Sequence, residues 1–313
     1  MERKNSPSYF GGTGALPPPL PLFSPTPKQS ADDGLPNHLG LPMMAAPKLL
    51  APQEHEQPPE KFFMTKGGSQ EDLVHRVKKD FLQRMAVGAG QPPNIVFDSI
   101  LKPNGASASY FKPDERGVLT PYYTPANASD TTLVFESRFE SGNLRRAIKV
   151  SEGEYDLLCR PDINTNSYAQ WFYFSVANTR TRRYKFNIIN MLKSDSLFNK
   201  GMMPLVYSTK EAEDKGVGWK REGFDICYYR NSKKYHTATF TIHSRHKDDT
   251  LYLAYCYPYT YSDLQADLAR YESNAYMRNY IRRRVLCETL CGNDCDVLTI
   301  TDFDCSNEEI KSR

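Results

Sequence analysis

The chain has 313 residues, a length typical of about two domains, and a formal net charge of +3. So mild a positive charge gives no indication of nucleic-acid binding, and no run of about 18 apolar residues occurs that could span a membrane as a helix. The apolar fraction of 39% is low for a globular chain, which indicates that part of the sequence builds no packed core.

The first 66 residues are predicted to be a disordered, proline-rich segment. Residues 1–60 hold 13 of the 22 prolines and little periodicity, so they cannot bury enough apolar surface to offset the entropy of ordering. Leu16–Pro21 reads Leu-Pro-Pro-Pro-Leu-Pro, which favours polyproline II. This segment is either a stiff linker or a ligand for a WW- or SH3-type partner.

Residues 67–116 are predicted to hold one amphipathic helix, over 69–87, and a linker. Ser69 is a suitable N-cap, and glycines and prolines after residue 87 end the pattern. The apolar residues of one helix face recur every four positions: Leu73, Val77, Phe81 and Met85. A lone amphipathic helix must dock, either on the β-rich region that follows or on a partner.

Residues 117–261 are predicted to form an antiparallel β-sandwich, which makes the chain mainly β. About eight short strands separated by turn residues favour this architecture. The segments with strand-like patterns are 133–139, 147–150, 155–160, 171–176, 184–189, 224–229, 235–243 and 251–255.

The most strongly patterned stretch is Trp171–Tyr207. Side chains alternate between the two faces of a strand, so Phe172 and Phe174 share one apolar face, and Tyr184 and Phe186 share another. A turn at residues 177–179 separates the two segments. We therefore interpret them as a hairpin that packs against a second sheet.

The end of the chain is predicted to hold a connecting helix over 262–274, capped by Ser262, and a hairpin within residues 275–313. The hairpin strands lie around Val285–Cys287 and Val297–Thr301. Residues 275–313 are fewer than an independent domain usually needs. We interpret them as the incomplete start of a larger domain, whose lone hairpin exposes its edges.

Four blocks resemble the amino-terminal domain of the cytosolic carboxypeptidases, and the resemblance spans about residues 130–302. The blocks are FESRFESGNL (135–144), WFYF (171–174), FNIINMLKSDSLFNKGMMPLVYS (186–208) and YCYPYTYSDLQ (255–265). The resemblance implies a β-sandwich followed by an α/β/α zinc carboxypeptidase domain. It also implies removal of glutamates from tubulin and other acidic protein tails. In that family a His-x-x-Glu pair and a distant His hold zinc, another Glu is the general base, and an Arg reads the substrate carboxylate.

The sequence departs from the family pattern where the catalytic residues are expected. The last hairpin resembles the first two strands of the catalytic domain, yet no His in the 313 residues is followed three places on by Glu. No zinc ligand or catalytic residue can therefore be assigned. We interpret the chain as a truncated or alternative product that holds the accessory domain and is inactive alone. The alternative is a non-catalytic binding or regulatory module for microtubules or acidic tails.

A metal site independent of the family has one weak candidate. His243, His246 and Asp249 are spaced so that they would meet one metal ion if the segment curled into a helical turn. The alternative is a solvated turn between two strands.

The seven cysteines are an odd number and follow no signal peptide, which indicates reduced thiols in a cytosolic protein. Cys287 and Cys295 flank the turn of the last hairpin, with Cys291 beside them, close enough to crosslink under oxidation. Their C-x3-C-x3-C spacing is not a standard zinc or iron–sulfur pattern.

Basic residues gather at the predicted turns. If they shared one edge of the sandwich, they would attract an acidic tail such as polyglutamate on tubulin or another modified protein. The alternative is scattered, solvated charge. The residues are Arg180, Arg182, Arg183, Lys185, Arg282, Arg283 and Arg284.

Overall fold

The computed structural model describes residues 70–87, 93–100, 111, 113, 117–165, 168–231, 234–305 and 308. All of them belong to one compact unit, residues 41–313. The predicted disordered segment and its proline run at Leu16–Pro21 lie outside the described residues. No helix among the described residues is long and apolar enough to cross a membrane.

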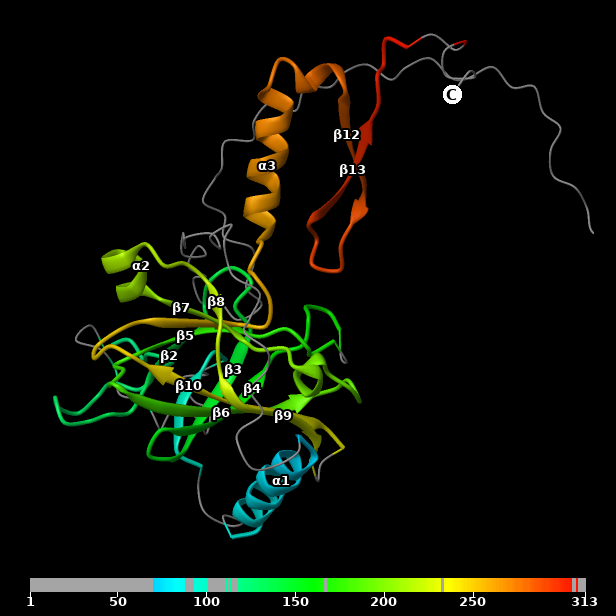
Figure 1. Cartoon of the computed structure of the whole chain (residues 1–313). Coiled ribbons are helices and arrows are strands. Elements are labelled where there is room, and N and C mark those ends of the chain that lie inside the picture. The colour runs from blue at the N-terminus through cyan, green and yellow to red at the C-terminus, as the bar shows by residue number, and fades with distance from the viewer. Residues whose placement is uncertain are drawn as a thin grey trace, which may run out of the picture. The chain divides into compact units, whose positions relative to one another are not determined.

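Two sheets pack face to face and form a β-sandwich, as predicted (Figure 1). The six-stranded sheet runs β1 (Ile95–Asp98), β3 (Leu144–Ser151), β4 (Glu154–Cys159), β6 (Arg182–Met191), β10 (His236–Ser244) and β9 (Phe224–Arg230). The five-stranded sheet runs β2 (Val134–Glu136), β5 (Tyr173–Ala177), β11 (Leu251–Ala254), β7 (Leu205–Ser208) and β8 (Lys220–Arg221). Strands β4 and β6 pair in parallel, whereas the other strand pairs of the described region are antiparallel.

An aromatic core fills the space between the two sheets. Phe172 and Phe174 come from the five-stranded side, while Phe186 and Phe240 come from the six-stranded side, and all four are fully buried. The rings of Phe172 and Phe240 stack with centroids 5.7 Å apart, and those of Phe174 and Phe186 meet edge to face at 5.9 Å. Burying each ring stabilises the fold by about 1.5–3 kcal/mol. The aromatic core is therefore the main interaction that holds the two sheets together.

The predicted hairpin between segments 171–176 and 184–189 is wrong. Strand β5 pairs with β2 and β11, whereas β6 pairs with β4 and β10 in the opposite sheet. The turn at Asn178, whose φ of 61° lies in the left-handed region, carries the chain from one sheet to the other. The alternation of apolar and polar side chains identifies only the apolar face of a strand. The prediction failed because two strands that face one core from opposite sheets show the same alternation as two strands of a hairpin.

Helix α1 (Gln70–Val87) forms where the apolar periodicity predicts it and docks on the outer face of the six-stranded sheet (Figure 1). Val77 and Phe81 lie in a buried cluster with Cys227 and Tyr229 of β9. The rings of Phe81 and Tyr229 meet edge to face at 6.0 Å. The helix therefore docks on the β domain, the first of the two predicted alternatives. The side chain of Met85 lies outside the described residues.

The N-cap of helix α3 (Tyr261–Ser273) lies two residues before the predicted cap. Thr260 is the N-cap, and its hydroxyl accepts a hydrogen bond from the Asp263 N–H at 3.1 Å. The Asp263 carboxylate in turn accepts the Thr260 N–H at 2.8 Å. This reciprocal capping box makes Thr260 the start, so the expectation that Ser262 caps the helix is wrong.

After α3, the predicted hairpin is present as β12 (Ile281–Glu288) and β13 (Asp294–Ile300). It forms a separate two-stranded sheet. Three short helices complete the described elements: η2 (Leu197–Lys200), α2 (Thr209–Lys215) and η3 (Met277–Asn279).

Candidate functional site

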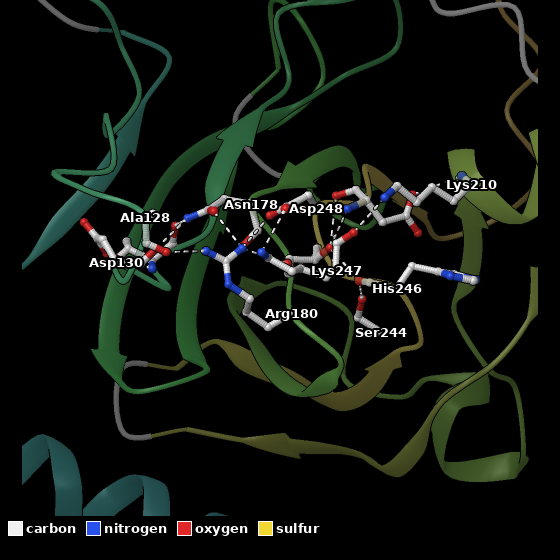
Figure 2. Close-up of polar contacts among 12 residues, drawn as sticks. Ala128, Asp130, Asn178, Arg180, Lys210, Ser244, His246, Lys247 and Asp248 are labelled. Atoms are coloured by element: carbon white, nitrogen blue, oxygen red, sulfur yellow. Dashed lines mark hydrogen bonds and ion pairs between the residues drawn. The ribbon is translucent and has the colours of Figure 1, made fainter.

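Four of the basic residues predicted to bind acidic tails lie at the crossing from β5 to β6 and in the first residues of β6. We call Arg180, Arg182, Arg183 and Lys185 the basic edge. The Arg180 guanidinium is held on two sides, as Figure 2 shows: its Nη1 donates to Asp248 Oδ1 at 2.7 Å, and its Nη2 donates to the Ala128 carbonyl at 3.1 Å. This arginine clamps three segments together and is only 19% exposed.

Two other cations of the basic edge are also neutralised locally. Arg182 Nη1 lies 2.6 Å from Glu152 Oε1, and Lys185 Nζ lies 3.2 Å from Glu154 Oε1. Arg183 differs, because its guanidinium lies 4.6 Å from the centre of the Phe224 ring. No carboxylate of the described residues lies within ion-pair distance of Arg183. The basic edge therefore keeps little uncompensated charge.

A hydrogen-bond network connects the β5–β6 crossing to the loop between β10 and β11 (Figure 2). Thr179 Oγ1 lies 3.1 Å from the carbonyl oxygens of His246 and Asp249 and accepts the Asp249 N–H at 2.9 Å. The Asp248 N–H donates to the Thr179 carbonyl at 2.8 Å. Because Thr179 is fully buried, these bonds fix the two loops as one rigid corner of the sandwich.

The weak metal candidate is not assembled in the structure. Asp249 is buried, and its carboxylate accepts hydrogen bonds from Ser208 Oγ at 2.5 Å and the Lys210 N–H at 3.1 Å. His243 is exposed, while His246 Nε2 faces Glu211 at 3.9 Å. Among the described residues, no group of three His, Cys, Asp or Glu side chains could hold a metal ion. Asp249 instead stabilises the positive N-terminus of α2.

Glu211 is the centre of a second charged cluster. Its carboxylate, 8% exposed, forms ion pairs with Lys220 and, at 3.7 Å, with Arg245. Burial alone would raise the pKa of Glu211, but the hydrogen bond from Lys220 and the nearby positive charges outweigh it and lower the pKa. A carboxylate held ionised by two cations is suited to fixing α2 against β8, and less suited to proton transfer.

The three arginines of β12 have different environments. Arg283 Nε lies 2.8 Å from Asp296 Oδ1, and its Nη1 lies 3.3 Å from Glu272, so it ties the hairpin to α3. The hydrogen bond from Arg283 lowers the pKa of Asp296. Arg282 lies over the Phe303 ring at 4.3 Å, and Arg284 is exposed. Neither Arg282 nor Arg284 has an ion-pair partner within the described part of the chain.

The hairpin exposes large apolar side chains, which we call the hairpin surface. A two-stranded sheet has two free edges and buries little of its own area. The exposed fractions are 52% for Val285, 64% for Leu286, 36% for Leu298 and 70% for Ile300. Apolar exposure of this kind marks a surface suited to contact with another part of a protein.

One buried charge cluster was not predicted. Asp98, at the end of β1, is fully buried and forms ion pairs with Arg145 and, at 2.8 Å, with Arg146 of β3. Burial and the neighbouring Arg146 lower the pKa of Arg145 to about 10. The sequence shows the adjacent arginines, but their partner lies more than 40 residues away and only the β1–β3 register brings it near.

Comparison with known proteins defines the class of this sandwich. Residues 135–256, from β2 to just beyond β11, match the family model described as the cytosolic carboxypeptidase N-terminal domain. Residues 135–256 therefore form an amino-terminal domain of the cytosolic carboxypeptidase type.

Several curated relatives share this region. Mouse cytosolic carboxypeptidase 1 is 50% identical over 202 residues, which cover 60% of this chain and 16% of that protein. Bovine cytosolic carboxypeptidase 3 is 39% identical over 249 residues, which cover 78% of this chain and 23% of that protein. The chain thus spans less than a quarter of the length of these two relatives.

Solved structures similar to this chain include a metallo-carboxypeptidase from Burkholderia cenocepacia. It has a TM-score of 0.39 and 21% sequence identity, and the similarity covers 54% of this chain and 40% of that one. A putative carboxypeptidase from Burkholderia mallei has a TM-score of 0.41 at 17% identity, covering 56% and 41%.

Proposed function

We propose that this chain supplies the non-catalytic amino-terminal domain of a zinc metallocarboxypeptidase that removes glutamates from tubulin or other acidic protein tails in the cytosol. The observation that carries the proposal is the family match over residues 135–256. Relatives that share this domain at about half identity are named cytosolic carboxypeptidases. The sandwich in this proposal is a scaffold, since its described polar clusters are ion-paired or hydrogen-bonded within the domain.

Zinc does not fit the candidate residues within the described part of the chain. The Asp249 carboxylate accepts hydrogen bonds at the start of α2, and His246 faces Glu211. The 313 residues also contain no His-x-x-Glu pair. The zinc of the proposed enzyme would therefore be held by residues outside this sequence. We expect no carboxypeptidase activity from the 313-residue chain by itself.

The hairpin surface supports a structural role for the C-terminal elements. Its exposed leucine, isoleucine and valine side chains would be buried if β12 or β13 gained a neighbouring strand or a covering helix. Arg283 holds the hairpin to α3 through Glu272, and its pair with Asp296 links β12 to β13. In the proposed enzyme, α3 and the hairpin connect the sandwich to the catalytic domain.

A domain exchange tests this proposal. Residues 135–256 of this chain replace the matching segment of mouse cytosolic carboxypeptidase 1, and glutamate release from a polyglutamate-tailed peptide is measured. We expect the exchanged protein to keep activity within a few-fold of the mouse protein, because the scaffold is equivalent. A folded, soluble exchanged protein without activity would contradict the proposal. The unmodified mouse protein at equal concentration is the control.

Recognition of acidic tails by the domain itself is a second proposal. The observation that favours it concerns three of the seven basic residues predicted to bind acidic tails. Arg183 lies over the Phe224 ring and Arg282 over the Phe303 ring, Arg284 is exposed, and none of the three has an ion-pair partner among the described residues. A microtubule pelleting assay tests it, with and without the glutamate-rich tails. Tail-dependent pelleting that weakens in Arg183→Gln and Arg284→Gln would support it, and equal pelleting in all cases would end it. A WW- or SH3-type partner at Leu16–Pro21 stays a prediction outside the described residues.

A further inference from the structure

The turn of the β12–β13 hairpin brings two thiols together. Cys287 and Cys295 are direct partners in the antiparallel register. In such a pair the Cα atoms lie about 4.5–5.5 Å apart, which falls inside the range of about 4.4–6.8 Å that a disulfide requires. The sequence spacing places Cys287, Cys291 and Cys295 at one turn without choosing among them, whereas the register makes Cys287 and Cys295 direct partners.

Local irregularity gives this pair some freedom to adjust. A register shift between Val285 and Cys287 places an extra residue, Leu286, opposite β13. A bulge of this kind twists the ladder locally, so small rotations can bring the two sulfur atoms into bonding geometry. Beyond the pair, a backbone hydrogen bond closes the turn: the Thr289 N–H donates to the Asn293 carbonyl at 2.8 Å. The pair therefore sits at the base of a formed turn.

The thiols are accessible and influence each other. Cys287 is exposed and Cys295 is partly exposed, whereas Cys159 and Cys227 are buried in the sandwich. Desolvation, together with the charge of Cys295 and a hydrogen bond to it, raises the pKa of Cys287. The Cys287 thiol therefore stays protonated more readily than it would alone, and its closeness to Cys295 favours a bond between the two sulfur atoms once one has reacted.

We propose that Cys287 and Cys295 form a reversible cross-strand disulfide, which makes the hairpin turn an oxidation-sensitive modification site. The oxidant is a low-molecular-weight disulfide such as oxidised glutathione. The Cys287 thiolate attacks one glutathione sulfur and releases one glutathione thiolate. The Cys295 thiolate then attacks the Cys287 sulfur of the mixed disulfide and releases the second. Two protein thiols are oxidised, one glutathione disulfide is reduced to two thiols, and the two protons pass to glutathione.

The crosslink would hold the end of the hairpin closed. A two-stranded hairpin is marginally stable in water, and a covalent link between its strands removes conformations from the opened state. The hairpin surface and its edges would then open less often in the oxidised form. This inference concerns the 313-residue chain and does not depend on the proposed enzymatic function.

Disulfide mapping tests the proposal on the 313-residue chain. The protein is equilibrated in glutathione buffers of increasing oxidised fraction, alkylated, digested and analysed by mass spectrometry. We expect the Cys287–Cys295 link to form at a lower oxidised fraction than any link that contains Cys291 or Cys305. It should disappear in Cys287→Ser and Cys295→Ser and persist in Cys291→Ser, the matched control from the same turn.

Hydrogen exchange supplies the second measurement. Oxidation should slow amide exchange in residues 281–300 by about tenfold or more, with little change in the sandwich, and the reduced Cys291→Ser chain should behave like the reduced wild type. Preferred linkage through Cys291, or glutathione adducts on Cys287 and Cys295 without an internal link, would overturn the proposal. So would a correct link that leaves exchange in the hairpin unchanged.

Discussion

Phe186 shows how single residues hold the two sheets together. It is fully buried. The centre of its ring lies 5.8 Å from that of Phe240 on the same sheet and 5.9 Å from that of Phe174 on the opposite sheet. The sequence pattern identifies it as a core residue because it lies on the apolar face of an alternating strand. The pattern does not identify its aromatic neighbours, which come from four other strands: Phe135, Tyr155, Phe174 and Phe240.

Replacing Phe186 by alanine should therefore cost a large part of the stability of the domain. Removal of a buried aromatic ring from a packed core typically costs about 3–5 kcal/mol. Urea unfolding followed by tryptophan fluorescence measures the loss. Tyr168→Ala is the control, since Tyr168 is 66% exposed and should change stability by less than about 0.5 kcal/mol. Equal effects of the two substitutions would contradict this account of the core.

Glu211 makes stability depend on pH in a defined direction. Its folded pKa is lower than its ordinary value of 4.5, so the ionised form stabilises the fold above that value. The contribution is lost as pH falls through the folded pKa. Glu211→Gln should cost about 1–2 kcal/mol at pH 7, because Lys220 and Arg245 each lose one of their two carboxylate partners and keep only Glu222. The difference from wild type should shrink as pH falls below the ordinary value of 4.5 and through the lower folded pKa.

Unfolding measured at a series of pH values checks this behaviour. Glu213→Gln is the matched control, since Glu213 lies on the same helix and is exposed. A Glu211→Gln variant whose deficit stays constant down to pH 3 would show that the Lys220 and Arg245 pairs are not its source.

Among the helices and strands, those with a clear local periodicity could be predicted from the sequence. Those held by contacts with distant segments could not. Helix α1 and the last hairpin follow from periodicity and turn residues. Helix α2 was not predicted, although its N-cap Ser208 accepts the Glu211 N–H and is a local signal. Its first turn is also held by Asp249, about 40 residues further along the chain. Strand β1 was likewise missed, since its place depends on the Asp98 pairs with β3.

The docking of α1 can be tested through the thiol beneath it. Cys227 is fully buried next to the helix, and burial raises its pKa to about 12. Phe81→Ala should loosen the helix and increase the rate of Cys227 alkylation under native conditions by about tenfold or more. Lys79→Ala, on the exposed face of the same helix, should leave the rate unchanged. An unaltered rate in Phe81→Ala would mean that α1 does not protect the thiol.

At the scale of the whole molecule, the fold class and the family follow from the sequence, while the charge pattern does not. The aromatic blocks identify the sandwich because a core constrains many residues at once. The basic turns suggested a binding surface, yet Arg180, Arg182 and Lys185 are each within ion-pair distance of a carboxylate. Partners of surface charges depend on which loops meet at one edge. That arrangement is a property of the folded chain and cannot be predicted from the spacing of charged residues in the sequence.

Metal-dependent glutamate release is the measurement that tests the central proposal most directly. The cellular protein is purified with an antibody against residues 117–261 and assayed on a polyglutamate-tailed peptide beside the recombinant 313-residue chain, each with and without a zinc chelator. We predict chelator-sensitive release by the cellular protein and none by the recombinant chain. Chelator-sensitive release by the recombinant chain, or no release by the cellular protein, would contradict the account.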